Sequence, residues 1–163
     1  MMKKVLLFFL LLITLVINRS MIFAVEDNDS NLDETQTLQI KKDINNLLNK
    51  RANLWNELFS EEKKLEEITE ELKEIVEDPL LTYDIEAFNQ IKAQNTGMEK
   101  ILKVDVLKIK NTILGENEIT ADIEVEWLME GFEKNYKEQV DYSMKLIKDD
   151  DKWKIYDYKV IEP

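Results

Sequence analysis

Apolar and polar residues alternate most clearly between residues 119 and 129. Every second residue there is apolar and those between are mostly charged, which is the period of a β-strand buried on one face. Similar patterns predict strands over 101–113, 136–147 and 153–161. Short turns separate the four strands, which favours an antiparallel meander. The apolar face of the second strand consists of Ile119, Ala121, Ile123, Val125, Trp127 and Met129.

The first and last of these strands change parity along their length. In the first, a β-bulge near Val106–Leu107 would bring two apolar sets to the same face. In the last, the parity mixes after Ile155. The two sets of the first strand are Leu102, Val104 and Val106, followed by Leu107, Ile109 and Ile113.

Before the strands, apolar residues recur at intervals of three and four, which predicts helices over 37–59, 61–77 and 83–94. Ser60 is a suitable N-cap for the second helix, and Pro79 ends it because the residue before proline is disfavoured in helical geometry. An alternative is one continuous helix over 44–76 with heptad spacing. Arg51 and Glu61 interrupt that heptad pattern, which favours two helices.

The N-terminus has the pattern of a secretory signal peptide over 1–24. Two lysines precede an apolar run, residues 5–17, that is shorter than the roughly 20 residues of a membrane span. A cut after Ala24 is expected, with an uncleaved anchor as the alternative. Residues 25–36 are polar and acidic and predict a disordered linker, so 37–163 would be a single α+β domain.

Charge and cysteine content narrow the function further. The chain has 34 acidic and 22 basic residues and a net charge of −12, and it offers no basic patch for nucleic acid. It has no cysteine, so it carries no disulfide framework and no lipid-modified cysteine. Together with the leader, this predicts an exported protein, extracellular or associated with the cell envelope.

Helices followed by a curved antiparallel meander resemble the nuclear transport factor 2-like domains, within the wider cystatin-like group of α+β folds. The resemblance rests on a hydrophilic turn leading into Trp153 and Ile155, and on the inward aromatic residues Trp127 and Tyr142. It covers about 37–163 and implies N-terminal helices packed on one face of a curved four-stranded meander. The connection 78–82 is too short for the strand pair that members of this family usually carry there.

Little in the sequence points to catalysis. Histidine and cysteine, the commonest base, nucleophile and metal ligands, are absent, and no catalytic residue, metal site or cofactor is predicted. Isomerase-type members of the resembled family pair an acidic base with a tyrosine, which implies a pocket formed by Glu138 or Asp157 with Tyr142 and Trp127. The alternative is that Tyr142 and Trp127 are core residues.

The sequence therefore favours an exported, non-catalytic binding or assembly domain at the bacterial cell envelope. Its contact would be the convex or edge surface of the sheet, with an unknown protein partner or a second copy, and Trp55 and Phe132 are candidate contact residues. No membrane contact is expected in the mature form unless the leader is retained. The alternatives are a small-molecule-binding or isomerase-like enzyme, and a helical tethering or adhesion protein.

Overall fold

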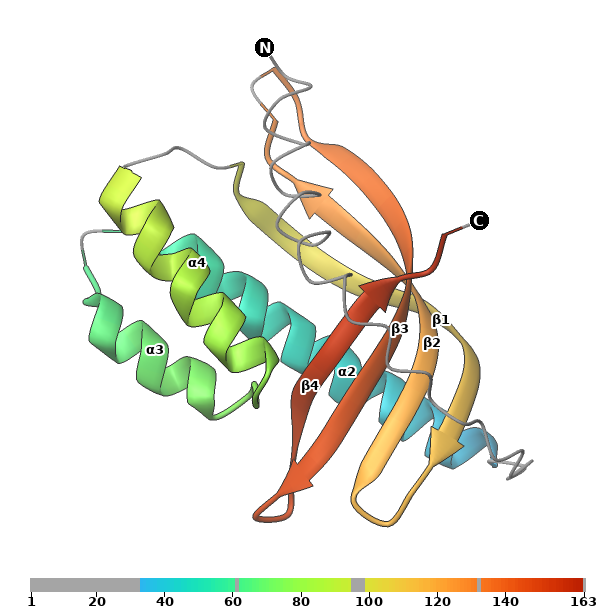
Figure 1. Ribbon diagram of the computed structural model, residues 1–163. Helices are drawn as coiled ribbons and strands as arrows, with labels where there is room; N and C mark the ends of the chain where they lie inside the picture. The colour runs from blue at the N-terminus through green and yellow to red at the C-terminus, as the bar shows by residue number, and fades with distance from the viewer. Residues whose placement is uncertain (1–32, 61, 95–98, 132, 163) are drawn as a thin grey trace.

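The computed structural model describes residues 33–60, 62–94, 99–131 and 133–162. Three helices pack against a four-stranded antiparallel sheet with strand order β1-β2-β3-β4 (Figure 1), which confirms the predicted α+β meander. The predicted leader 1–24 and the contact candidate Phe132 lie outside the described residues. The elements are α2 (Glu34–Glu57), α3 (Leu65–Lys73), α4 (Leu80–Gln94), β1 (Ile101–Leu114), β2 (Glu118–Met129), β3 (Tyr136–Asp149) and β4 (Lys152–Val160).

Helix α2 begins three residues earlier than predicted because a capping box fixes its start. The Asp33 carboxylate accepts a hydrogen bond from the Gln36 backbone N–H at 2.7 Å, and the Gln36 side chain accepts one from the Asp33 backbone N–H at 3.2 Å. The last three residues of the predicted linker, 34–36, are therefore helical. The linker residues before Asp33 lie outside the described part of the chain.

The second helix is shorter than predicted, and the continuous-helix hypothesis is wrong. Helix α2 ends at Glu57 and α3 begins only at Leu65. The Ser60 hydroxyl accepts a hydrogen bond from the Glu62 backbone N–H in the intervening turn instead of capping a helix from residue 61. This break turns α3 back beside α2 and α4, so the long rod required by a helical tether does not form.

Helix α4 begins at Leu80, before the predicted start at 83. The Asp78 carboxylate accepts hydrogen bonds from the Thr82 backbone N–H and hydroxyl, so Asp78, and not Thr82, supports the start of the helix. The residues just before it, Ile75 to Glu77, lie beside β4.

The core lies between the helices and the apolar face of the sheet. The predicted parity of β2 is confirmed: Ile119, Ala121, Ile123 and Val125 are buried, and the residues between them face outward. Register pairing places the apolar residues of β3 on the same face. We call this helix-covered side the inner face and the opposite side the outer face. The largest fully buried side chains are Phe88, Ile44, Leu58, Ile68, Leu72, Ile123, Met144, Leu146, Ile155, Val76, Val104 and Val125.

Strand β1 contains the predicted bulge after Val106 and two further register shifts, between Ile101 and Lys103 and between Ile109 and Asn111. Leu102 and Leu107, predicted to face inward, are 40% and 38% exposed. Ile113 pairs with Thr120 on the outer face. The bulges remove these residues from the alternation, and the inward apolar set is Ile101, Val104, Val106, Ile109 and Leu114.

Strand β4 also contains a register shift, opposite Lys145 and Leu146. Ile155 pairs with Leu146 and Tyr158 with Met144, so both belong to the inner face. Asp157 pairs with Lys145 and therefore belongs to the outer face. The mixed parity predicted for this strand is thus a bulge around Tyr156.

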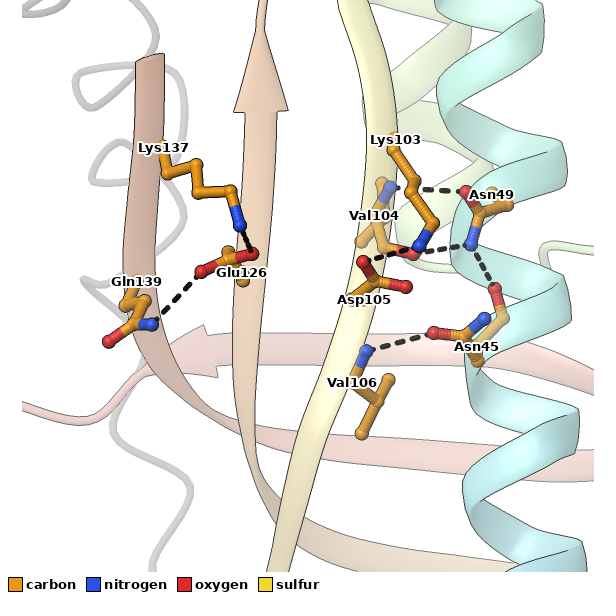
Figure 2. Close-up of polar contacts among 9 residues, drawn as sticks. All are labelled: Asn45, Asn49, Lys103, Val104, Asp105, Val106, Glu126, Lys137 and Gln139. Carbon is orange, nitrogen blue, oxygen red and sulfur yellow. Dashed lines mark hydrogen bonds and ion pairs between the residues drawn. The ribbon is translucent and has the colours of Figure 1, made fainter.

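The free edge of β1 is covered by asparagine side chains of α2 (Figure 2). Asn49 donates to the Val104 C=O at 2.6 Å and accepts from its N–H at 3.1 Å, and Asn45 accepts from the Val106 N–H at 2.8 Å. Asn56 forms the same two-way contact with Ile101. We call Asn45, Asn49 and Asn56 the asparagine ladder.

The ladder works because helix and strand repeats nearly match. Four residues of helix advance about 6 Å, and two residues of strand advance about 6.7 Å, so Asn45 and Asn49 reach alternate residues of β1. The next step would be Asn53 with Leu102. The bulge at Leu102 breaks the match, and the ladder resumes at Asn56 with Ile101.

The opposite edge of the sheet is covered by backbone. The Ile155 N–H donates to the Ile75 C=O at 2.9 Å, and the Glu77 N–H donates to the Ile155 C=O at 2.8 Å. Val76 thereby forms a parallel bridge with Ile155. As predicted, the α3–α4 connection is too short to form a strand pair. It contributes a single bridge at the edge of β4 instead.

Candidate functional site

A buried ion pair lies between the helices and the inner face of the sheet. Arg51 of α2 donates from Nε to Asp84 Oδ2 at 2.7 Å and from Nη2 to Asp84 Oδ1 at 2.5 Å. Only 10% of the Arg51 side chain and 4% of the Asp84 side chain are exposed. This two-point contact joins α2 to α4 and fixes the orientation of the guanidinium plane.

Aromatic rings enclose this ion pair and extend from it across the sheet. The guanidinium carbon of Arg51 lies 5.4 Å from the ring centroids of both Trp55 and Tyr158. Tyr158 meets Tyr142 edge to face at 5.4 Å, and Tyr142 meets Trp127 in the same way at 6.4 Å. We call Arg51, Asp84, Trp55, Tyr158, Tyr142 and Trp127 the inner-face cluster; it spans α2, α4, β2, β3 and β4.

The electrostatics of the cluster favour hydrogen-bond donors over bases. Burial raises the pKa of the Tyr142 and Tyr158 hydroxyls above the ordinary value, so both stay protonated at neutral pH. Burial lowers the pKa of Arg51, but the Asp84 carboxylate and the Tyr158 hydroxyl more than offset this, and the net pKa is raised. Arg51 is therefore a permanent cation, and its charge is matched by Asp84.

The structure brings together three of the four predicted pocket residues. Trp127 pairs with Glu138 across β2 and β3 on the inner face, and Tyr142 contacts the Trp127 ring. The Trp127 indole N–H is buried, and its contact with the Tyr142 hydroxyl does not have normal hydrogen-bond geometry. These three residues lie on the same face of two neighbouring strands, as the alternation predicted, with Val140 between Glu138 and Tyr142 on β3.

Asp157 lies apart from the other three, on the outer face. Its carboxylate accepts a hydrogen bond from the Tyr158 backbone N–H at 2.8 Å. Partial burial raises the pKa of Asp157. The hydrogen bond from Tyr158 lowers it by a smaller amount, so the net pKa is raised. The bulge around Tyr156 separates Asp157 from Tyr142, so Glu138 is the predicted acid that shares a face with Tyr142.

The contact candidate Trp55 is a core residue. It is 7% exposed and packs edge to face against Phe88 at 5.0 Å. The residues that sequence reasoning missed are Arg51 and Asp84. Arg51 stands within the apolar stripe of α2, and Asp84 lies on the same face of α4 as the core residue Phe88. A charged residue on the core face of each helix was the available signal for a buried ion pair.

The outer face carries ion pairs between strands, one of which spans the intervening strand β2. Glu126 of β2 accepts from Lys137 Nζ at 2.6 Å and from Gln139 Nε2 at 3.1 Å (Figure 2). Lys110 of β1 donates to Asp141 of β3 at 2.6 Å. The hydrogen bond from Lys137 is the main reason that the pKa of Glu126 is lowered. This face is thus charged and largely neutralised within itself.

Two kinds of feature are absent from the part of the chain that the structure describes. No group of three or more acidic, histidine or cysteine side chains in this part of the chain could hold a metal ion. Of the helices in the same residues, none is long and apolar enough to cross a membrane.

No protein-family model and no curated protein matches the sequence. Solved structures match at the level of fold. The intermembrane-space region of the chloroplast protein ARC6 aligns at 12% identity with a TM-score of 0.51, covering 76% of this chain and 97% of that one. An NTF2-like protein from Cytophaga hutchinsonii aligns at 14% identity and a TM-score of 0.49, covering 81% and 100%.

An IcmL-like type IV secretion system protein from Legionella pneumophila aligns at 11% identity and a TM-score of 0.45, covering 81% of this chain and 96% of that one. The structural neighbours of this chain therefore include nuclear transport factor 2-like proteins, which confirms the predicted resemblance. The likeness is one of fold and does not extend to sequence.

Proposed function

We propose that this chain is an exported, non-catalytic domain used for binding or assembly at the bacterial cell envelope. The observation that carries the proposal is the inner-face cluster. Its cation, Arg51, and its carboxylate, Asp84, form an ion pair with each other. Its tyrosines are protonated and pack against aromatic rings. Because the polar groups of this cluster contact one another, we assign them a structural role and expect binding to involve the protein surface.

The envelope location rests on two further observations. Residues 1–24 have the charge and apolar pattern of a signal peptide. The fold is also found in the intermembrane-space region of the chloroplast protein ARC6, a compartment bounded by membranes.

The covered sheet edges narrow the choice of contact surface. An uncovered strand edge would pair readily with another strand, but the asparagine ladder occupies the Ile101–Val106 part of β1 and Ile75–Glu77 occupies β4 at Ile155. Contact through side chains is therefore favoured over strand pairing at these positions.

Production of the full chain in a bacterial host tests the proposal. We expect intact-mass measurement to give a mature N-terminus at Val25, and protease added to spheroplasts to degrade the protein. Brief cross-linking of intact cells should give discrete larger species. A full-length precursor protected inside the cell, or a chain that never cross-links, would contradict it.

One observation favours a second function, a small-molecule site at Trp127, Glu138 and Tyr142. The Trp127 indole N–H is buried, and its polar contact, with the Tyr142 hydroxyl, lacks normal hydrogen-bond geometry, whereas such a group usually has a well-placed partner. If a ligand binds there, the dye 1-anilinonaphthalene-8-sulfonate should fluoresce on the folded protein, and Trp127→Phe should reduce the signal. Equal signals from both proteins would argue against the site.

A further inference from the structure

The start of β3 is a sheet edge that has no strand beside it among the described residues. The last backbone hydrogen bond that reaches β3 from the end of β4 runs from the Ile161 N–H to the Asp141 C=O at 2.9 Å. Figure 1 shows the β2–β3 hairpin continuing beyond the end of β4. We call residues 136–140 the open edge. Five strand residues span about 17 Å, which is room for a short extended segment.

Two residues of the open edge turn their backbone groups outward. β3 pairs with β2 without a register shift from Tyr136 to Ile147, so successive residues direct their N–H and C=O groups to opposite edges. Because the Asp141 C=O points toward β4, the backbone groups of Gln139 and Lys137 point to the same side. No strand of the described chain pairs with them there, and both residues are exposed.

The side chains of the open edge leave this backbone accessible. Lys137 Nζ and Gln139 Nε2 both contact Glu126 of β2 (Figure 2), so these side chains are turned toward the neighbouring strand and away from the edge. The part of β1 beyond the asparagine ladder differs, because it carries the exposed Lys108 and Lys110 and two register shifts. Lysines and bulges protect a strand edge from pairing. The open edge of β3 is therefore the better site for an added strand.

A half-buried carboxylate lies on the inner side of the open edge. Glu138 stands opposite Trp127 on β2. Burial is the main cause of the raised pKa of Tyr136 and Tyr142, and the charge of Glu138 adds to both shifts. Of the ion pairs in the described chain, none includes Glu138. A cation placed opposite Glu138 would therefore gain a charge partner on a face rich in aromatic rings.

A second copy of this chain fits the open edge poorly. Antiparallel pairing of Lys137 with Gln139 of the other copy sets the two Glu138 side chains directly opposite each other, where like charges destabilise a sheet. Pairing Lys137 with Lys137 likewise opposes two cations. Pairing Gln139 with Gln139 would require the backbone of Asp141, which is already bonded to Ile161. The charges of this edge thus favour a basic partner.

We propose that the open edge of β3 takes up an extended segment of a partner protein by strand addition, with a lysine or arginine opposite Glu138. This inference rests on the proposed binding function and names the chemistry of the partner. The segment runs antiparallel to β3 and prolongs the sheet in line with β4. Its residues beside the basic one pair with the backbone of Lys137 and Gln139. The next residues are apolar, because they lie opposite Tyr136 and Val140 on the inner face.

A designed strand tests the inference on the full chain produced in a bacterial host. The probe is Val-Thr-Lys-Thr-Val held extended in a disulfide-closed β-hairpin, because a preorganised strand loses less entropy on binding. Titration to about 5 mM probe covers a dissociation constant of about 1 mM. In NMR spectra the amide signals of Lys137 and Gln139 should move most. The same hairpin with glutamate at the centre of the strand should bind at least about fivefold more weakly.

Charge reversal tests the pairing with Glu138. Glu138→Lys should reverse the order of the two probes, because the glutamate probe then supplies the opposite charge. Glu116→Lys is the matched control, since it changes the net charge equally at an exposed residue of the β1–β2 turn. It should leave the ratio of the two affinities as in wild type. Circular dichroism establishes that each variant is folded.

Removal of a backbone donor tests strand pairing separately from charge. Gln139→Pro deletes the N–H that points to the open edge and spares the hydrogen bonds to β2. It should abolish binding of the lysine probe, whereas Gln139→Ala, which keeps this N–H, should bind nearly as wild type does. The lysine probe methylated on the backbone nitrogens of both threonines makes the same test on the wild-type chain, and it should not bind.

Three outcomes would overturn this inference. The lysine probe could leave the signals of Lys137 and Gln139 unchanged at the highest concentration. The two probes could bind the wild-type chain equally, which would remove the role of Glu138. The methylated probe could bind as well as the unmethylated one, which would exclude strand pairing. Each result would leave export and cross-linking in cells unaffected, whereas a chain that binds the probe but is never exported or cross-linked would overturn the proposed function alone.

Discussion

The inner and outer faces of the sheet both carry ion pairs, but in opposite surroundings. On the inner side, Arg51 and Asp84 are buried and enclosed by aromatic rings. On the outer face, 61% of the Lys137 side chain is exposed while it contacts Glu126. The pairs are similar in length, 2.5 Å and 2.6 Å, so distance alone does not distinguish them.

The difference teaches that the surroundings of an ion pair decide its role. A buried pair has lost its hydration, so each charge depends on the other and removing one partner is costly. An exposed pair can exchange its partner for water at little cost. We therefore expect the inner pair to fix how α2 and α4 pack, and the outer pairs to keep the exposed face soluble without determining the fold.

The largest effect should come from breaking the inner pair. Asp84→Ala leaves the Arg51 cation buried without its carboxylate, and we expect a loss of about 3–5 kcal/mol in the free energy of unfolding. Urea unfolding followed by circular dichroism measures it. A loss no greater than that of an exposed substitution would show that Arg51 can reach solvent in the folded state.

A double variant separates the charge from the packing. In Arg51→Met/Asp84→Leu both charges are replaced by apolar side chains of similar reach. Such replacements of a buried pair are often neutral or stabilising, so the double variant should be more stable than Asp84→Ala alone. If the two are equally unstable, the aromatic contacts of Arg51, and not its charge, hold the cluster.

The second largest effect concerns the asparagine ladder, where the inner layer meets the sheet edge. Asn49→Leu removes both hydrogen bonds to Val104 and leaves that partly buried peptide group without its partner, which should cost about 1–3 kcal/mol. Amide hydrogen exchange at Val104 should accelerate.

Asn53→Leu is the matched control for this ladder variant. It makes the same substitution four residues further along α2, at an exposed position. It should change the free energy of unfolding much less and leave exchange at Val104 unaltered. Equal losses in both variants would indicate an effect of leucine on the helix and not of the missing hydrogen bonds.

The sequence predicted the layers of this fold because they depend on local periodicity. The alternation of apolar residues predicts the buried and outward positions of β2 correctly from Ile119 to Val125, because the side-chain period of a strand is fixed. Helix ends were less predictable. The capping residues that decided them, Asp33 and Asp78, lie in polar stretches that periodicity does not describe.

The candidate site was only partly predictable, for a different reason. Trp127, Glu138 and Tyr142 share a face because strand parity places them there. Asp157 left that face because a single bulged residue reverses parity. The Arg51–Asp84 pair joins residues on two helices that are far apart in sequence, and periodicity within one element carries no information on such a contact.

A smaller effect of opposite sign is expected at Asp157 on the outer face. Because its pKa is raised in the folded state, the folded protein binds the proton more tightly than the unfolded chain, and stability falls as pH rises through the folded pKa. Asp157→Asn should therefore be slightly more stable than wild type at pH 7. The gain should vanish below the unfolded pKa of about 3.9. Urea midpoints compared at acid and neutral pH would show this, and a variant less stable at both would contradict it.

The smallest effect should come from the outer pair of Lys137 and Glu126. Lys137→Gln removes the hydrogen bond that chiefly lowers the pKa of Glu126, so that pKa should rise in an NMR titration, while the contact from Gln139 keeps part of the shift. A carboxylate with a depressed pKa contributes stability above its unfolded pKa and loses it as pH falls through the folded value. The variant should therefore be slightly less stable than wild type at neutral pH, and equally stable below the folded pKa of Glu126, where wild type has already lost this contribution.

At neutral pH the melting temperature of Lys137→Gln should stay close to that of Lys134→Gln, which makes the same change in an exposed loop. The reason is that the Lys137 end of the pair is 61% exposed, so that water can replace the lost ammonium group. A fall in melting temperature comparable to that of Asn49→Leu would mean that Glu126, whose side chain is only 15% exposed, behaves as a buried group. The contrast between the two faces would then be one of degree, and the outer lysines would take part in holding the strands together.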